Sequence, residues 1–559
     1  MKKILSPTLL ILVVFFATNL SAQECTASRN DLNMPQYAVH FKDKADTPYS
    51  INNPLEYLSQ KSIDRRIKYN LTVTKDDLPV NPNYIDSVCL TGAFVSASSR
   101  WSNSVLVYAD SSRLEKIRKL DFVEKIVYVK PAEETSKKDA FHPKWMNEKY
   151  ENLKQTRGDD NYGYAFAQIN QLNGVVVHEQ GYAGEGILIA VLDAGFQKAD
   201  QVSGFEPLFE SGRIVLERNV VEPNRSIYDE RISNHGTLVL SCMGGNIEGE
   251  YVGTAPFASY ALIVTEDAPT EYLIEEYFWM IGAEIADSLG ADIINSSLGY
   301  TDFDDASMNH THSDLDGKTV VSSIAAKMAA ERGIFVNVSA GNEGNSTSFP
   351  WVGSPADTPE ALTLGAVNLD GEIAPFSSIG NNGAGDPKPD VLACGSKAVV
   401  LLSNNNIATS SGTSFSSPIN CGMVACIIQA APDKKPQEIL NAIQKSANRY
   451  PEHDIKYGYG IPDYDKVLKL LGINPSVEDK KVSKLIYYPN PVNDKLYFIN
   501  NEKNIKNVEL SDIAGKLIKN VIANSNQTSV EISDLAAGLI FVKVRYDDYS
   551  SEIVKCVVY

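Results

Sequence analysis

Residues 409–430, Thr-Ser-Ser-Gly-Thr-Ser-Phe-Ser-Ser-Pro-Ile-Asn-Cys-Gly-Met-Val-Ala-Cys-Ile-Ile-Gln-Ala, join a turn of small residues to a helix that is apolar on nearly every side. Such a helix is buried, and packing on all its faces holds its first turn in place. The N–H groups of that turn have no partner within the helix and can stabilise a negative charge. Ser414 stands there and is a candidate nucleophile, although a serine that merely caps a buried helix is an equally good interpretation.

The region before this helix alternates long apolar runs with helical stretches. The apolar runs are 186–192, 260–264, 291–295, 333–338 and 361–367, and the helical stretches are 235–243, 272–289 and 322–332. Strands that are buried on both faces have this pattern, and they belong to parallel sheets covered by helices. We therefore expect a doubly wound α/β domain over residues 161–471.

Three polar residues stand at the ends of these buried elements. Asp193 closes the run 186–192, His235 opens a helix, and Ser414 opens the central helix. In open α/β sheets such residues meet in a crevice beyond the carboxyl ends of the strands. Singly, Asp193 could cap a turn and His235 could be an ordinary residue at a helix start. Together, in the order Asp, His, Ser, they predict the triad of a serine hydrolase.

The residues around these three form a specific set of motifs. The motifs are Val-Leu-Asp-Ala-Gly at 191–195, Asn-His-Gly-Thr at 234–237, Ser-Leu-Gly at 297–299, Ala-Gly-Asn-Glu-Gly at 340–344 and Gly-Thr-Ser-Phe-Ser-Ser-Pro at 412–418. Over about residues 160–470 the chain resembles the subtilisin-like (subtilase, S8) family of serine endopeptidases. One departure is Ala194, where the family usually has Ser or Thr. The change removes a hydroxyl beside the aspartate but no catalytic group.

The resemblance implies the chemistry of the site. Ser414 would attack the scissile carbonyl, His235 would act as general base and then as general acid, and Asp193 would orient the imidazole. Asn342 matches the family's oxyanion-binding asparagine, with the Ser414 backbone N–H as the second donor. The alternative for Asn342 is a turn residue before Gly344.

The same resemblance indicates how a substrate would bind. Ser297, Leu298 and Gly299 match the segment that pairs with an extended substrate by strand addition. Gly353 falls at the floor of the family's primary specificity pocket. A glycine there leaves room for a large apolar or aromatic side chain, so we expect cleavage after such residues.

Residues 302–317 form an acidic loop that also carries two histidines. Oxygen ligands in it could hold Ca²⁺, and subtilases often bind calcium, but the spacing defines no ligand set. A solvated loop or a rim of the substrate site is the alternative interpretation. The chemistry itself requires no cofactor.

The flanking segments predict a secreted precursor. Residues 1–22 have a basic start, an apolar run and small residues typical of a signal peptide. Residues 23–135 have an α+β pattern and resemble a subtilase inhibitory propeptide, followed by a polar linker at 136–160. After a second linker at 472–482, residues 483–559 predict a β-sandwich that resembles the C-terminal sorting domain of the type IX (Por) secretion system of Bacteroidota.

Composition excludes some classes of partner and limits the chemistry of the cysteines. The 559-residue chain has a net charge of −19 and a pI of about 4.9, which argues against nucleic-acid binding. After the signal peptide, no apolar run is long enough to span a membrane. Cys421 and Cys426 are five residues apart on one helix, too far for a relaxed disulfide, and are expected to be core residues.

The sequence as a whole predicts a secreted or cell-surface serine endopeptidase. Its partners would be protein or peptide substrates, its own propeptide and the type IX secretion machinery. A catalytically inactive binding or adhesion protein on the same fold is the alternative from another class. An esterase or peptide ligase would share the nucleophile and differ only in the acceptor of the acyl group.

Overall fold

The computed structural model describes residues 33–132, 150–153, 158, 161–473, 485–500, 503–512, 516–547 and 551–559. The predicted signal peptide and most of the two predicted linkers lie outside these residues. The chain divides into two compact units after Ile473.

A seven-stranded, wholly parallel sheet forms the centre of the larger unit, with the strand order β14-β13-β12-β11-β6-β10-β7. Its strands are β6 Leu188–Asp193, β7 Ile214–Asn219, β10 Ser259–Val264, β11 Ile293–Ser296, β12 Phe335–Ser339, β13 Leu362–Val367 and β14 Val391–Cys394. All five predicted apolar runs became strands of this sheet. The predicted doubly wound α/β domain is confirmed. Strand β7 was not predicted because, at the edge of the sheet, it carries polar residues that stay partly exposed.

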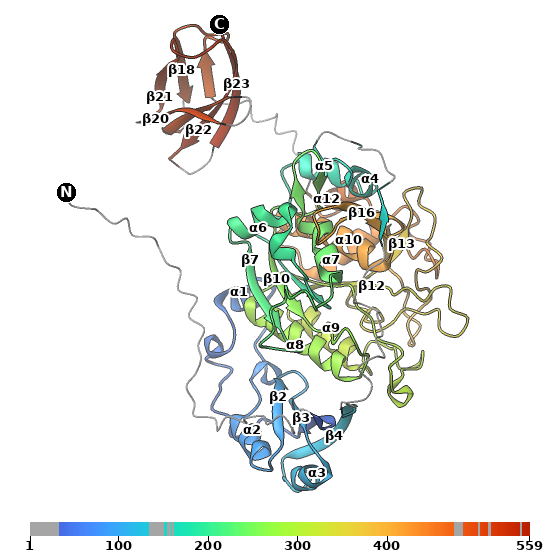
Figure 1. The fold of residues 1–559 in the computed structure, drawn as a ribbon. Helices are drawn as coiled ribbons and strands as arrows, with labels where there is room; N and C mark the ends of the chain where they lie inside the picture. Colours follow the sequence, from blue (N-terminus) through green and yellow to red (C-terminus); the bar gives the residue numbers. More distant parts are fainter. Residues whose placement is uncertain are drawn as a thin grey trace, which may run out of the picture. The chain divides into compact units, whose positions relative to one another are not determined.

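Helices cover both faces of the sheet because its strands alternate apolar side chains between two cores. In β6, Ile189 and Val191 face the core beneath α7 (His235–Gly244) and α10 (Thr413–Ala430), whereas Ala190 and Leu192 face α8 (Ile274–Leu289) and α9 (Val321–Glu331). Figure 1 shows these helices on the two sides. The other elements of this part are α4 Phe166–Asn170, α5 Gly174–Glu179, α6 Glu206–Glu210, α11 Pro436–Ser446, α12 Tyr464–Leu470, β5 Tyr150–Asn152, β8 Asn246–Ile247, β9 Tyr251–Val252, β15 Ala398–Leu401 and β16 Ile407–Ser410.

Helix α10 is the buried helix predicted from residues 409–430. Every residue from Thr413 to Ile428 is buried. Cys421 and Cys426 are free thiols inside it, as expected. The helix packs against α7 and beneath strands β11 to β14, which places its first turn close to the start of α7.

Residues 36–130 fold into an antiparallel sheet with the order β2-β3-β1-β4 and three helices. The elements are β1 Gln36–Phe41, α1 Gln60–Tyr69, α2 Pro82–Cys89, β2 Phe94–Ser99, β3 Ser104–Tyr108, α3 Ser111–Ile117 and β4 Val123–Lys130. Strand β1 alternates: Val39 and Phe41 belong to this sheet's own core, whereas Ala38 belongs to the core around α8. The sheet therefore covers the outer side of α8 (Figure 1). The predicted α+β unit is confirmed, but α2 and β2 were not predicted.

The smaller unit consists of two antiparallel sheets around a core of its own, as predicted for a β-sandwich. One sheet has the order β17-β18-β21 and the other β20-β19-β22-β23. The strands are β17 Leu485–Tyr488, β18 Lys495–Asn500, β19 Ile505–Ser511, β20 Leu517–Ser525, β21 Gln527–Glu531, β22 Gly538–Tyr546 and β23 Ser551–Val558.

Candidate active site

Asp193 and His235 meet at the centre of the sheet. Asp193 is the last residue of β6, whose neighbours β10 and β11 lie on opposite sides, so the order of the strands reverses there. His235 is the first residue of α7. Its Nδ1 lies 2.7 Å from Asp193 Oδ1, and both side chains are fully buried. The two residues predicted from separate motifs therefore form a hydrogen-bonded pair.

Two glycines allow this approach. Gly195, with a φ of +150°, would place a Cβ 2.7 Å from the carbonyl oxygen of Ser233. A Cβ on Gly236 would lie 2.5 Å from the carbonyl oxygen of Gly195, to which the Gly236 N–H donates at 2.9 Å. The motifs Asp-Ala-Gly and His-Gly are thus required sterically for the contact between aspartate and histidine.

The two oxygens of the Asp193 carboxylate have unequal surroundings. Oδ1 accepts hydrogen bonds from the Ala194 N–H at 2.7 Å and from His235. Oδ2 is buried and has no hydrogen-bond partner among the residues that the structure describes. Ala194 is itself fully buried next to it. The departure noted in the sequence therefore leaves one carboxylate oxygen without the hydroxyl donor that a serine or threonine could supply.

Ser414 is the second residue of α10, in the first turn of this helix. Its Oγ donates to the carbonyl oxygen of Ser297 at 3.4 Å, and Ser297 Oγ donates to the carbonyl oxygen of Ser414 at 2.9 Å. The ring of the next residue, Phe415, is centred 6.3 Å from the His235 ring. Ser414 is 3% exposed, so only a small part of it faces solvent.

Asn342 lies beside the residue that precedes Ser414. Its Oδ1 accepts hydrogen bonds from Thr413 N–H at 2.9 Å and from Thr413 Oγ1 at 3.0 Å. These two bonds fix the amide with its oxygen toward the helix start. Asn342 is predicted from its motif, whereas Thr413 is not, although its position in Gly-Thr-Ser is a usable signal.

A buried polar network anchors α10 to the sheet. Asn337 Nδ2 on β12 donates to Asn295 Oδ1 at 3.1 Å and to Ser417 Oγ at 2.8 Å. Asn420 Nδ2 donates to Asn337 Oδ1 at 3.0 Å, and Asn420 Oδ1 accepts from the Tyr464 hydroxyl at 2.7 Å. The sequence analysis attributed the position of the helix to packing alone. Directional bonds one turn after Ser414 also hold it.

Asn337→Ala is expected to lower the free energy of unfolding by about 1–3 kcal/mol, because the buried Asn420 Nδ2 would lose its partner and Asn295 Oδ1 would keep only the hydrogen bond from Ser417 Oγ. Urea denaturation measures this in a Ser414→Ala background, where self-digestion is prevented. Asn345→Ala, at an exposed position, is the control and should change the value by less than about 0.5 kcal/mol. Equal effects of the two substitutions would contradict the role given to the network.

The predicted substrate-binding residues lie next to one another. After Ser297, Leu298 is buried in the core around α8, and Gly299 leads to Tyr300, whose N–H donates to Ser354 O at 2.8 Å. Gly353 is buried, and a Cβ on it would lie 3.1 Å from Thr301 Cγ2. The segments 297–301 and 353–354 are therefore side by side, and the first of them touches Ser414.

The loop 302–317 is held by local bonds and by one buried contact. His310 Nε2 makes a short hydrogen bond to Glu276 Oε1 at the start of α8. Burial alone would lower the pKa of His310, but Glu276 outweighs it and raises the pKa. Among the residues that the structure describes, no three His, Cys, Asp or Glu side chains converge as they would around a metal ion. Calcium binding by this loop stays a prediction.

Comparison with known proteins shows which family this chain belongs to. Residues 184–460 match the model of the subtilase family of peptidases. Subtilisin NAT of Bacillus subtilis subsp. natto is 30% identical over 311 residues, covering 54% of this chain and 72% of that protein. The chain belongs to the subtilase family. This subtilase has further relatives. The serine protease AprX of Bacillus subtilis strain 168 is 28% identical, over 51% of this chain and 67% of that protein. Subtilisin-like protease 2 of Trichophyton rubrum is 33% identical, over 44% of this chain and 51% of that protein. This subtilase is a serine-type endopeptidase.

The flanking units of the subtilase match known modules as well. Residues 36–155 match the Peptidase S8 propeptide domain of Bacteroidota, and residues 486–559 match a secretion system C-terminal sorting domain. The enzyme is therefore made as a precursor and carries a module for secretion and attachment to the cell surface. The propeptide match reaches beyond residue 135, and the processing site itself stays a prediction. Within the described residues, no helix combines the length and the apolar character needed to cross a membrane.

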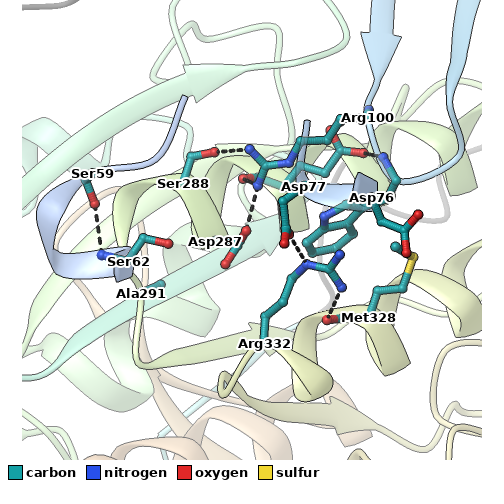
Figure 2. A network of polar contacts seen from close by, with 12 residues as sticks. Ser59, Ser62, Asp76, Asp77, Arg100, Asp287, Ser288, Ala291, Met328 and Arg332 are labelled. Atoms are coloured by element: carbon teal, nitrogen blue, oxygen red, sulfur yellow. Dashed lines mark hydrogen bonds and ion pairs between the residues drawn. The ribbon is translucent and has the colours of Figure 1, made fainter. Parts of the chain in front are cut away.

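The propeptide holds the catalytic domain through a buried carboxylate on α8. Asp287 is fully buried and pairs with Arg65 and Arg66 of α1 and with Arg100, at 2.5, 2.9 and 2.6 Å. Burial by itself would raise the pKa of Asp287, but the three guanidinium groups together lower it. Figure 2 shows Arg100 reaching Asp287 and Ser288 from the propeptide side.

Further contacts surround this ion cluster. Arg332, at the end of α9, donates from Nε to Asp77 of the propeptide at 2.6 Å (Figure 2). Glu284 on α8 accepts hydrogen bonds from Ser99 Oγ at 2.6 Å, from the Arg100 N–H and from the Trp101 N–H. No residue of this interface is predicted from the sequence, since nothing in the local pattern of α8 shows which carboxylates the propeptide will cover.

His40 of the propeptide is a buried titratable group that contacts α8 at this interface. Its Nε2 lies 2.9 Å from the Tyr277 hydroxyl of α8, and Nδ1 lies 3.2 Å from Ser102 O. Burial and the charge of Lys125 lower the pKa of His40 to about 4. A histidine with a lowered pKa contributes stability above its unfolded pKa of about 6.5, and that stability is lost as the pH falls from there toward 4.

We expect the full chain with Ser414→Ala to lose about 2 kcal/mol of unfolding free energy through His40 alone between pH 7 and pH 5. Comparing urea denaturation of this protein at the two pH values with that of a His40→Gln form isolates the contribution, because other groups titrate in both. If the two proteins show the same pH dependence, His40 is not the group responsible.

Proposed function

We propose that this secreted serine protease hydrolyses peptide bonds with a triad of Asp193, His235 and Ser414 and an acyl-enzyme intermediate. The observation that carries the proposal is the buried hydrogen bond between His235 Nδ1 and Asp193 Oδ1, next to the helix start that presents Ser414. With its Nδ1–H directed to the carboxylate, the imidazole has Nε2 as its basic nitrogen. That atom takes the Ser414 proton during attack and returns it to the leaving amine.

Asn342 and the backbone N–H of Ser414 stabilise the oxyanion. Thr413 holds the amide oxygen of Asn342, so its NH₂ group is the end that faces a substrate. Donors fixed in advance cost no reorganisation when charge develops on the carbonyl oxygen. The Ala194 position leaves Asp193 Oδ2 without a hydroxyl donor but leaves the bond to His235 intact.

Substrates would pair with Ser297–Gly299 and place the side chain before the cleaved bond over Gly353. The direct contact of Ser297 with Ser414 supports this placement. The partners we propose are protein or peptide substrates, the enzyme's own propeptide and the type IX secretion machinery.

Gly353→Val is expected to lower kcat/KM for peptides with phenylalanine before the cleaved bond by about 10–100-fold, while peptides with alanine there change little, because the added methyl groups occupy the pocket floor. Paired fluorogenic peptides measure the ratio. A wild-type profile with acidic or basic residues favoured at that position would contradict the assignment.

A serine-directed covalent inhibitor tests the mechanism directly. Full-length protein that has matured itself is assayed on casein with and without the inhibitor, and the modified residue is located by mass spectrometry. We expect complete loss of casein hydrolysis and one adduct, on Ser414. Hydrolysis that survives full labelling of Ser414 would overturn the proposal, and would leave the inactive binding protein or a different nucleophile as explanations.

A further inference from the structure

A group of four acids, of which three are buried and Asp267 is partly exposed, lies beside the triad aspartate and the substrate-binding segment. It consists of Glu266, Asp267, Glu271 and Glu275. Strand β10 runs in register with β6, so Val264 pairs with Asp193, and the acids begin two residues later. A small cavity of about 50 Å³ is lined by Ala194, Glu266 and Asp267 together with nearby residues.

The other side of the group touches the chain that follows Ser297–Gly299. The Tyr300 hydroxyl donates to Glu266 Oε1 at 2.5 Å. The backbone N–H of Glu271 donates to Asp304 Oδ2 at 3.1 Å, at the base of the loop 302–317. The acids therefore lie between the end of β6 and the residue after the proposed substrate-pairing segment.

A cation from another part of the chain already occupies this place. Lys130, the last residue of β4 in the propeptide, makes a short ion pair with Asp267 Oδ2 and is 8% exposed. Its Nζ lies 6.0 Å from the centre of the Tyr272 ring. Thr270 Oγ1 donates to the same carboxylate oxygen at 2.9 Å and fixes its direction. This arrangement is a formed ammonium site, with an anion, an aromatic face and an orienting hydroxyl.

The pKa values of the neighbouring acids indicate that Asp267 is the charged partner of Lys130. Burial, together with the charge of Glu271, raises the pKa values of Glu266 and Glu275. Burial alone would lower the pKa of Lys130, but Asp267 outweighs it and the pKa is raised. The charged partner of the ammonium is thus Asp267, in surroundings already rich in carboxyl oxygens.

We infer that Asp267 and Tyr272 form a subsite for a basic side chain, held by Lys130 in the precursor and taken by a lysine or arginine of the substrate once the propeptide has left. Lys130 precedes the predicted linker in which processing would occur, so the matching substrate residue lies on the N-terminal side of the cleaved bond. The inference rests on the proposed function and names the substrate class of that site: proteins with a basic residue several positions before the bond.

Matched peptides test the subsite in the mature enzyme produced from the full chain. One peptide series carries lysine, arginine, methionine or glutamate at a single position, which is moved from the fourth to the tenth residue before the cleaved bond. At one of these seven positions, the kcat/KM of the lysine and arginine peptides should exceed that of the methionine peptide about tenfold. High salt should reduce this difference. Asp267→Asn should bring the ratio close to one while the methionine peptide changes less than about twofold.

Two further variants test whether the preference for a basic residue depends on the charge of Asp267. Asp302→Asn, an exposed acid in the neighbouring loop, is the matched control and should keep the tenfold ratio. Asp267→Lys should favour glutamate over lysine at the same position. Equal rates for lysine and methionine at every position in the wild type, or an unchanged ratio in Asp267→Asn, would overturn the subsite alone. Failure of the wild type to cleave any peptide would overturn the proposed function and the subsite with it.

Discussion

Ser414→Ala is expected to lower kcat on casein by about 10⁶-fold, the size known for removal of the same nucleophile from subtilisin, the enzyme that gives this family its name. The expectation follows from the position of Ser414 in the first turn of a fully buried helix, next to the Asp193–His235 pair.

The same variant should also stay as an uncleaved precursor. Mass spectrometry of the purified full chain then shows the propeptide still attached, whereas the wild type releases it. Ser416→Ala is the matched control, since Ser416 lies in the same turn and donates to Thr413 O rather than to the substrate segment. Casein digestion by Ser414→Ala at the wild-type rate would refute the mechanism.

The second large effect is expected at the propeptide interface. In the Ser414→Ala precursor, Asp287→Ala should lower the free energy of unfolding by about 3–5 kcal/mol, because removing one partner of a buried ion cluster leaves the others buried without compensation. Arg65, Arg66 and Arg100 all lose their shared carboxylate. Urea denaturation with the propeptide still attached measures the change.

An exposed ion pair at the same interface supplies the control. Lys61 pairs with Asp292 at 2.8 Å, but the lysine side chain is 44% exposed. Lys61→Ala should therefore cost less than about 1 kcal/mol. If Asp287→Ala costs no more than Lys61→Ala, the buried cluster does not hold the propeptide. A second test is the yield of active enzyme, which should fall in Asp287→Ala on the wild-type background.

These two effects concern different stages in the life of the enzyme. In the proposed mechanism Ser414 acts on substrates and on the precursor's own linker, whereas Asp287 pairs with the propeptide while the catalytic domain is still covered. The pairing of Lys130 with Asp267 connects the stages, because the site that positions the end of the propeptide is the one we infer for a basic substrate residue.

Local motifs in the sequence predicted the buried pair of Asp193 and His235 that the structure shows. Asp193, His235 and Ser414 were found because each stands at the end of a buried element with a fixed set of neighbours. The adjacent glycines are part of the same signal, since Gly195 and Gly236 occupy positions where a Cβ would collide with backbone. Strand β7 and helix α2 were missed because an edge strand and a short helix have weak periodicity.

The sequence by itself thus determined the family and the doubly wound sheet and predicted the chemistry of the site, because these follow from short-range patterns of burial and spacing. Only the tertiary structure decided which charges are buried and what they contact. Asp287 and Asp267 look like ordinary surface acids along the chain, and their partners Arg100 and Lys130 are more than 130 residues away. Burial of a charge depends on which unit packs over it, so no local pattern could reveal the propeptide interface or the cation subsite.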